Sequence, residues 1–206
     1  VATVYAYDPA TDRWTERAPM LTARGALSVT EHEGKLYAIG GYDRKGNNAQ
    51  VEVYDPLRNV WTTAASLPTP RDHLATATVA GKIYAIGGRI DGDYSRNLAV
   101  VERYDPATDR WRRVADLPTA RSGMTAAVVE GKIYVFGGEG AVGTFNENEA
   151  YDPVRDRWQR LTPMPTARHG LGSAVVQRRV YVTSGGPTPG GSFSDLNEVF
   201  SPTAEK

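Results

Sequence analysis

Three histidines are the side chains of this sequence best suited to exchanging a proton near neutral pH. A metal site needs several His or carboxylate groups close together, but His32, His73 and His169 lie far apart in the sequence. The chain has no Cys, which excludes thiol nucleophiles, zinc-thiolate sites and disulfides. It also lacks a Gly-x-Ser-x-Gly elbow, a Walker loop and a His-Glu-x-x-His pair. We therefore predict no metal site, no cofactor and no catalytic residue.

Four arginines occupy one recurring position, shortly after a proline, and could form a basic ring for an anion. They are Arg24, Arg71, Arg121 and Arg168. Carboxylates recur in step with them at Asp8, Asp55, Asp105 and Asp152, and again at Asp12, Asp109 and Asp156. A buried arginine needs an acidic partner. We therefore expect these arginines to pair with the aspartates and to serve the structure rather than a ligand.

The arginines keep step with two other markers, so the chain is built from repeats. Tyr-Asp-Pro precedes each of Trp14, Trp61, Trp111 and Trp158, and these tryptophans are 47, 50 and 47 residues apart. A Gly-Gly pair follows the same interval at 40–41, 87–88, 137–138 and 185–186. Three markers in step indicate a repeated supersecondary unit.

Each repeat predicts four short antiparallel strands. Leu74 to Val79 is rich in small and β-branched residues, and Ile83 to Ile86 is a continuous apolar run of the kind buried on both faces. The third strand stops at Asp-Pro because proline cannot donate to a ladder, and the fourth carries the Trp. Such sheets match the blades of a β-propeller, with small residues at the hub and tryptophans between blades.

The motifs identify a resemblance. Gly-Lys-Ile-Tyr-Ala-Ile-Gly-Gly at 81–88, Val-Glu-Arg-Tyr-Asp-Pro at 101–106 and Asp-Arg-Trp at 109–111 are similar to the kelch motif. The resemblance covers nearly the whole chain and implies an all-β, kelch-type β-propeller with four repeats of four antiparallel strands. We expect one domain over 1–206, with repeats near 19–65, 66–115, 116–161 and 162–206, and with 1–18 supplying two strands of a shared or partial blade.

The number of strands does not fit a closed ring. The sequence predicts two strands at the N-terminal end, three sets of four, and three at the C-terminal end. Kelch propellers resemble rings of five to seven blades, so we expect an incomplete part of a larger, about six-bladed ring. The first residue is Val1 rather than Met, which fits a processed or truncated chain. Open blade edges invite pairing, so we expect self-association.

Residues that differ between repeats at loop positions are free to serve function. The loops after each Gly-Gly pair are the longest and most varied, and binding usually resides on such loops. In kelch propellers that capture peptides, the pocket is lined by residues after Gly-Gly, residues after the repeated arginine, and polar residues late in the loop. By this resemblance we expect ligand contacts from Tyr42, Asp72, His73, Arg89, Arg96, Ser122, Glu139 and His169, with Asn47 and Thr144 at loop positions of the third kind.

The resemblance implies a non-catalytic scaffold that binds a protein or peptide on this face. The expected set mixes both charge signs, unlike the Arg- and Ser-rich pockets of relatives that bind acidic peptides. A galactose oxidase-like propeller with copper-radical activity would need a Cys for its cofactor. This chain has no Cys, which excludes that activity. The alternative is a carbohydrate-active isomerase similar to kelch-type sialic-acid mutarotases, in which Arg89, Glu139 and His73 would hold a sugar acid.

A net charge of zero argues against binding of nucleic acid. No apolar run is long enough to cross a membrane, and the sequence does not indicate the compartment.

Overall fold

The computed structural model describes residues 1–202, and these form small antiparallel sheets. The N-terminal hairpin pairs β1 (Val4–Asp8) with β2 (Arg13–Arg17). Blade 1 has the order β3 (Ser28–His32), β4 (Lys35–Ile39), β7 (Val51–Asp55), β8 (Val60–Ala64). Blade 2 has the order β9 (Ala75–Val79), β10 (Lys82–Ile86), β11 (Val101–Asp105), β12 (Arg110–Arg113). Blade 3 has the order β13 (Thr125–Val129), β14 (Lys132–Phe136), β17 (Asn148–Asp152), β18 (Arg157–Arg160). Blade 4 has three strands, β19 (Gly172–Val176), β20 (Arg179–Thr183) and β21 (Asn197–Phe200).

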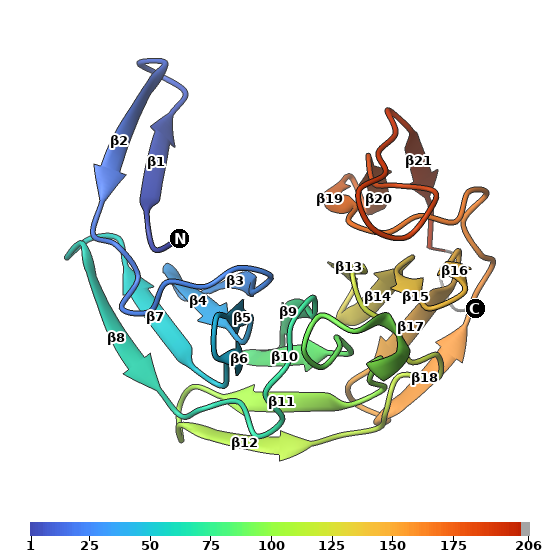
Figure 1. Ribbon diagram of the computed structural model, residues 1–206, viewed down its shortest axis with the longest axis horizontal. Helices are drawn as coiled ribbons and strands as arrows, with labels where there is room; N and C mark the ends of the chain where they lie inside the picture. The colour runs from blue at the N-terminus through green and yellow to red at the C-terminus, as the bar shows by residue number, and fades with distance from the viewer. Residues whose placement is uncertain (203–206) are drawn as a thin grey trace.

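The blades stand side by side around a hub and form a four-blade β-propeller arc (Figure 1). The first strands β3, β9, β13 and β19 contact one another in turn and line the hub. The N-terminal hairpin and blade 4 stand apart at the two ends of the arc, so the ring is open (Figure 1). The prediction of an all-β, kelch-type propeller with four-stranded antiparallel sheets is confirmed.

Side-chain size explains which strand lies where. The first strands carry small residues, and their hydroxyl groups bond between neighbouring blades: Ser28 with Thr76 at 2.7 Å and Thr30 with Thr78 at 2.9 Å. The second strands β4, β10 and β14 end in buried apolar residues, because a sheet lies on either side of each blade. Apolar clusters therefore fill the spaces between adjacent blades.

The tryptophans join one blade to the preceding one. In each complete blade the Trp ring lies 5.0 Å from the Tyr ring of the third strand, as for Tyr104 and Trp111. The indole Nε1 also donates to a backbone carbonyl of the preceding unit: Trp111 to Ala65 at 2.8 Å, and Trp158 to Ala115 at 2.9 Å. Trp14 stands at the end of the arc and is 69 % exposed.

The repeated arginines do serve the structure, but the predicted aspartate partners are wrong. Each arginine is buried and paired with a glutamate on the third strand of its own blade: Arg24 with Glu52, Arg71 with Glu102, Arg121 with Glu149 and Arg168 with Glu198. Arg71 shows the pattern, since its guanidinium also donates to the carbonyls of Thr69, Ala85 and Gly87 at 2.7–3.0 Å. The guanidinium thus ties the incoming linker to the strands of its blade.

The aspartates have two other functions, which explain their recurrence. Asp55, Asp105 and Asp152 end the third strands and accept backbone N–H groups two residues ahead, which fixes the turn. Asp109 and Asp156 accept the Tyr hydroxyl of their own blade and a backbone N–H of the preceding blade. The backbone N–H of Ala65 and the Tyr104 hydroxyl hold the pKa of Asp109 below its usual value.

The Gly-Gly pairs allow close backbone approach, which gives a testable difference between two glycines. Gly138 has φ of +124°, and a Cβ there would lie 2.8 Å from the carbonyl oxygen of Ser122. Gly131 also has positive φ, +75°, but a Cβ there would meet open space. We expect Gly138→Ala to lower the free energy of unfolding by about 2 kcal/mol more than Gly131→Ala, because a clash adds to the shared backbone strain. Urea unfolding of both variants measures the difference, and equal losses would contradict it.

Candidate functional site

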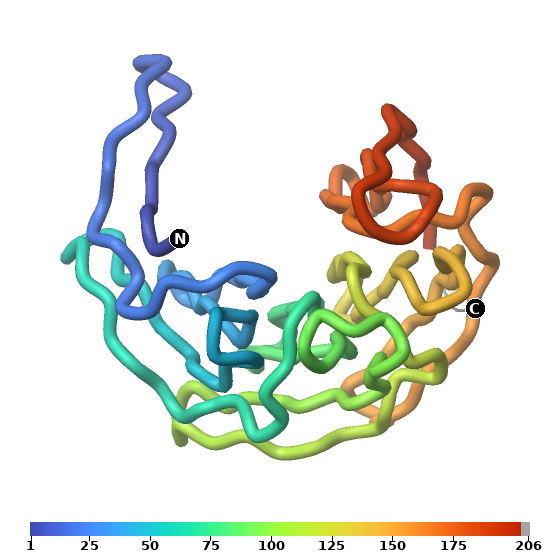
Figure 2. The backbone as a smooth tube through the Cα atoms, viewed as in Figure 1, coloured from blue at the N-terminus to red at the C-terminus, as the bar shows by residue number. Residues whose placement is uncertain are grey.

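The connections between second and third strands lie on one face of the arc, called here the loop face. They include the short hairpins β5 (Tyr42–Asp43) with β6 (Gly46–Asn47) and β15 (Glu139–Gly140) with β16 (Gly143–Thr144), and the 3-10 turn η1 (Tyr94–Arg96). Figure 2 traces these loops along the inner side of the arc. The sequence predicted varied loops here but not these small elements.

Backbone pairing gathers the predicted residues into one row. In each blade the residue after Gly-Gly, or the second glycine itself, pairs with the residue after the buried arginine: Gly25 with Tyr42, Asp72 with Arg89, Ser122 with Glu139, and His169 with Gly186. The repeated arginines and Gly-Gly pairs therefore position the residues that differ from blade to blade. This pairing explains why the residue after the buried arginine and the residue about 17 positions later, at the Gly-Gly pair, form one surface.

Arg89 is the centre of an ion-pair network that crosses the loop face. Its Nη1 donates to Glu139 Oε1 at 2.7 Å, and its Nε lies 3.3 Å from Asp72 Oδ1. Its guanidinium carbon lies 4.4 Å from the centre of the Tyr94 ring, a cation–π contact. Arg89, Asp72 and Glu139 are all buried. The network therefore joins blades 2 and 3 and fixes the 89–100 loop.

Asp72 carries the negative charge at one end of this network. It accepts from His73 Nδ1 at 2.6 Å, from Asn47 Nδ2 of blade 1 at 2.6 Å and from the Gly92 N–H at 3.0 Å. Burial acts to raise the pKa of Asp72, but these hydrogen bonds outweigh it and hold the pKa below the ordinary value. Arg89 Nη2 lies 3.0 Å from His73 Nε2, so the His73 ring bridges Asp72 and Arg89.

His169 contacts Glu139 at the other end of the network. Its Nδ1 lies 3.2 Å from Glu139 Oε2, and its Nε2 lies 3.1 Å from the carbonyl oxygen of Thr188. The two ring nitrogens therefore face the Glu139 carboxylate and the Thr188 carbonyl. The Gly190 N–H also donates to Glu139 Oε2 at 3.1 Å. Together these contacts hold the 187–196 loop of blade 4 against blade 3.

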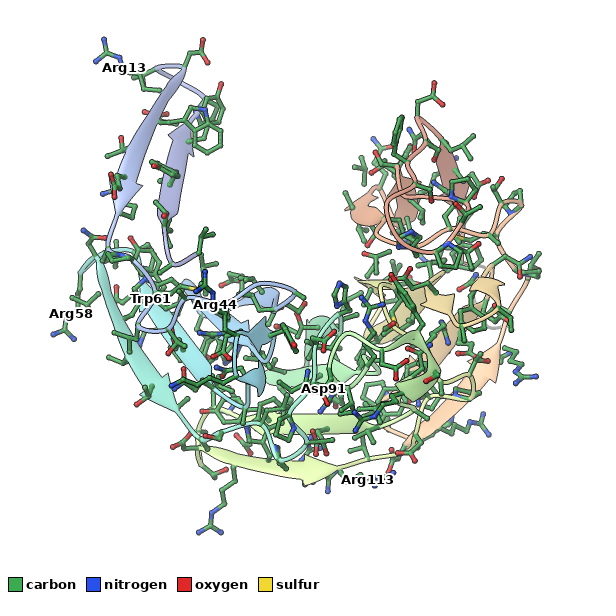
Figure 3. All side chains as sticks on the ribbon, viewed as in Figure 1. Arg13, Arg44, Arg58, Trp61, Asp91 and Arg113 are labelled. Carbon is green, nitrogen blue, oxygen red and sulfur yellow. The ribbon has the colours of Figure 1, made fainter. Side chains whose placement is uncertain are left out.

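The structure divides the predicted residues into two groups. Asp72, Arg89, Ser122, Glu139 and His169 are buried and joined in the network. Tyr42, His73 and Arg96 reach solvent, with Tyr42 40 % exposed and the Arg96 side chain paired with Asp91 at 2.7 Å. Figure 3 shows Asp91 on the inner loops, whereas Arg58 and Arg113 project from the outer rim. The exposed group is the part that can touch a ligand.

Sequence reasoning missed two contributors to this site. Asn97 donates from its Nδ2 to the Glu139 carbonyl at 2.7 Å, and the Thr188–Gly190 turn reaches across from blade 4. Asn97 stands late in its loop, where polar residues were expected, but its repeat siblings gave no signal because the loops differ in length. Thr144, which was predicted at this face, donates to the Pro187 carbonyl at 2.9 Å.

The lowered pKa of Asp72 predicts a pH dependence. A carboxyl whose folded-state pKa lies below the unfolded value of 3.8 adds stability above that value and loses it as pH falls through the folded pKa. We expect the free energy of unfolding of the wild type to fall more steeply below pH 3.8 than that of Asp72→Asn. Urea titrations at several pH values measure both slopes. Parallel curves would contradict this role for Asp72.

Two further observations concern the part of the chain that the structure describes. Within residues 1–202, no group of three or more His, Asp or Glu side chains is arranged to hold a metal ion. None of the helical segments in that range is long and apolar enough to cross a membrane.

A comparison with protein-family profiles agrees with the fold. The family profile described as the KLHDC2/KLHL20/DRC7 Kelch-repeats domain matches residues 28–204, well over half of the chain. A search of curated proteins found no match.

Proposed function

The chain belongs to the kelch-repeat family, and from that premise we propose that it is a non-catalytic scaffold that binds a protein or peptide segment on its loop face. The observation that carries the proposal is the division of the site: a buried ion-pair network centred on Arg89 fixes the loops, and Tyr42, His73 and Arg96 reach solvent beside it. Side chains held by a rigid scaffold lose little freedom when they bind, which favours recognition.

The surface beside Tyr42 supports the proposal. A hollow of about 600 Å³ lies there, and its walls include Tyr42, Asp43, Arg44 and Lys45 of the β5–β6 hairpin. An aromatic ring beside cationic and anionic side chains suits a peptide with mixed polarity, because tyrosine and arginine are the residue types that dominate binding energy at interfaces.

The sugar-acid alternative receives no support from the same geometry. A bound sugar carboxylate would need a cation free to receive it, but Arg89 already donates to Glu139 and contacts Asp72. His73 is likewise held by Asp72 and Arg89. Displacing these buried partners would leave carboxylates unpaired, which costs more than the new contact returns.

A peptide library displayed on phage tests the proposal. Peptides selected on the wild-type protein should bind the double variant Tyr42→Ala, Arg96→Ala at least about tenfold more weakly, because exposed Tyr and Arg side chains supply most of such contacts. The matched control is Leu57→Ala with Val154→Ala, two exposed residues in turns between third and fourth strands, at the opposite end of the third strands from the loop face. Selected peptides that bind both double variants equally well would overturn the proposal.

We also propose that the arc self-associates through its two ends. Val176 of β19 is 52 % exposed, although its repeat siblings Val79 and Val129 are buried by the following blade. Trp14 is similarly uncovered at the other end. Apolar flanks and unpaired strand edges favour association with another copy. Sedimentation velocity should show larger species as concentration rises, and fewer of them for Trp14→Ser, Val176→Ser. A monomer at every concentration would contradict this.

A further inference from the structure

Two arginines stand directly opposite each other on the outer strands of blade 2. The strand register pairs Arg103 of β11 with Arg112 of β12, and β12 lies on the outer rim of the arc (Figure 1). Directly opposite residues of an antiparallel pair have Cβ atoms about 4.5–5.5 Å apart, so the two side chains leave the sheet side by side. Like charges in this position destabilise a sheet. The pair therefore requires a reason other than sheet stability.

Comparison with the other repeats shows that the charged pair is particular to blade 2. The equivalent pair is Ala6 with Thr15 in the N-terminal hairpin, Val53 with Thr62 in blade 1, and Ala150 with Gln159 in blade 3. The scaffold thus forms the same strand pairing with uncharged side chains. Residues that differ between repeats are free to serve function, and this pair meets that criterion outside the loop face.

The pair lies on the flank of blade 2 that faces blade 3. Tyr84 of β10 is opposite Arg103, and its ring contacts the Tyr151 ring of blade 3 with centres 5.6 Å apart. Burial raises the pKa of Tyr84, and the positive charges of Arg103 and Arg112 oppose that rise. Both guanidinium groups therefore act on the boundary between the two blades. Arg112 is exposed and Arg103 is half-buried, so solvent reaches the pair.

The carboxylate that blade 3 contributes to this boundary is Asp156, and its Oδ1 is already used. That atom accepts the Tyr151 hydroxyl at 2.6 Å and the Ala115 N–H at 2.9 Å. These bonds hold the pKa of Asp156 below its ordinary value, and the charges of Arg112 and Arg103 lower it further. Within residues 1–202, however, neither arginine forms an ion pair with a carboxylate.

The charges on this flank leave an excess of positive charge. Asp105 is two residues from Arg103 and pairs with Lys82 at 2.8 Å, and Arg110 is opposite Asp105 in the register. The boundary thus combines four cationic side chains with two carboxylates: Lys82, Arg103, Arg110 and Arg112 with Asp105 and Asp156. The Nε of Arg103 is also buried without a hydrogen-bond partner. An unused donor beside excess positive charge favours an anion.

We propose that Arg103 and Arg112 bind a phosphate group, either inorganic phosphate or the phosphorylated side chain of a partner, on the outer flank between blades 2 and 3. The phosphate lies between the two guanidinium groups and accepts from both, because their N–H groups match the spacing of phosphate oxygens. A rotation of Arg103 toward the anion gives its Nε an acceptor. The two negative charges of phosphate balance the excess on the flank. This site is separate from the loop face, so it does not depend on the function proposed there.

Titration calorimetry of the 206-residue protein with inorganic phosphate, at constant ionic strength, tests the proposal. The variant Arg103→Val, Arg112→Thr has the residue pair of blade 1, so the blade should fold. We expect its phosphate affinity to fall at least about tenfold, because both guanidinium groups are lost. In chloride buffer its urea unfolding midpoint should equal or exceed that of the wild type, because two like charges no longer face each other.

The matched control removes two arginines of the rim that are not part of the pair. Arg58 and Arg113 project from the outer rim (Figure 3), and Arg113 pairs with Asp116. The variant Arg58→Gln, Arg113→Gln loses the same charge, so we expect its phosphate affinity to change less than about twofold, since solvent and salt screen distant exposed charges. Equal phosphate affinities of the Val–Thr variant and the wild type would overturn the proposal.

A tripeptide with a central phosphoserine identifies the source of the phosphate group. Tighter binding of this tripeptide than of inorganic phosphate assigns the site to a phosphorylated partner, and weaker binding assigns it to inorganic phosphate. In either case the Val–Thr variant should lose the binding, and the unphosphorylated tripeptide should not bind the wild type. A wild-type protein that binds neither inorganic phosphate nor the phosphorylated tripeptide would overturn the proposal.

Discussion

Replacing Glu102 with Gln is expected to lower the free energy of unfolding by about 3–5 kcal/mol, because it leaves a buried guanidinium without its counter-charge. Arg71 is fully buried, and its Nη1 lies 2.6 Å from Glu102 Oε2. Burial lowers the pKa of Arg71, and Glu102 opposes that effect. The variant keeps the size and shape of the side chain, so the loss measures charge rather than packing.

Urea unfolding measures this loss, and an exposed ion pair supplies the control. Arg113 and Asp116 pair at 2.6 Å on the surface. Asp116→Asn should leave the unfolding midpoint unchanged, because solvent screens exposed pairs. If Glu102→Gln had as small an effect as Asp116→Asn, the repeated Arg–Glu pair would not be a structural requirement of the blade.

Replacing Arg89 with Met is expected to have a comparable effect, about 3–5 kcal/mol, because two buried carboxylates lose their shared cation. Asp72 and Glu139 belong to different blades, and Arg89 is the side chain that contacts both. Tyr94 would lose its cation–π contact as well. We expect faster amide exchange in the 89–100 loop together with the lower unfolding free energy.

Arg96→Met is the matched control for this variant. Arg96 lies in the same loop and pairs with Asp91, but both side chains are half exposed. Its replacement should change stability far less than Arg89→Met does. Similar losses for the two variants would show that burial of the network is not what fixes the loops.

The repeat made most of the fold predictable from sequence. Positions that recur in every blade, such as Tyr104 and Trp111, satisfy the same packing in each copy, so their spacing reveals the strands. Gly138 shows the same principle, because it belongs to the recurring Gly-Gly pair and has both a positive φ and a backbone carbonyl, that of Ser122, where a Cβ would lie. The sequence within one repeat therefore predicts the strands of a blade, and the repetition predicts how the blades are arranged.

Partners across strands were harder to predict. Glu102 recurs in step with Arg71, two residues before each third-strand Tyr, and this spacing could have identified it. The predicted partners were the aspartates, such as Asp105, which recur equally well, but Asp105 fixes a turn on the opposite face. Recurrence alone cannot show which of the two carboxylates pairs with Arg71, whereas the direction of the strand does. Glu102 lies near the start of β11, beside the linker, and Asp105 lies at its end.

The candidate site was predictable in position but not in exposure. Sequence differences between repeats place Arg89, Glu139 and His169 on one face, and in the structure Glu139 pairs with both Arg89 and His169. That the three side chains bind one another depends on distances between blades, which no local pattern encodes. Their contribution to ligand binding stays a prediction.

The central claim is that ligand contacts lie on the loop face while the repeated positions serve the scaffold. Photo-crosslinking tests it most directly, with a photoreactive phenylalanine analogue placed at Tyr42 or, on the opposite face, at Leu57, which is 96 % exposed. With peptides selected on the wild-type protein, we predict crosslinks from position 42 and none above background from position 57. Crosslinks from position 57 that equal or exceed those from position 42 would contradict the account.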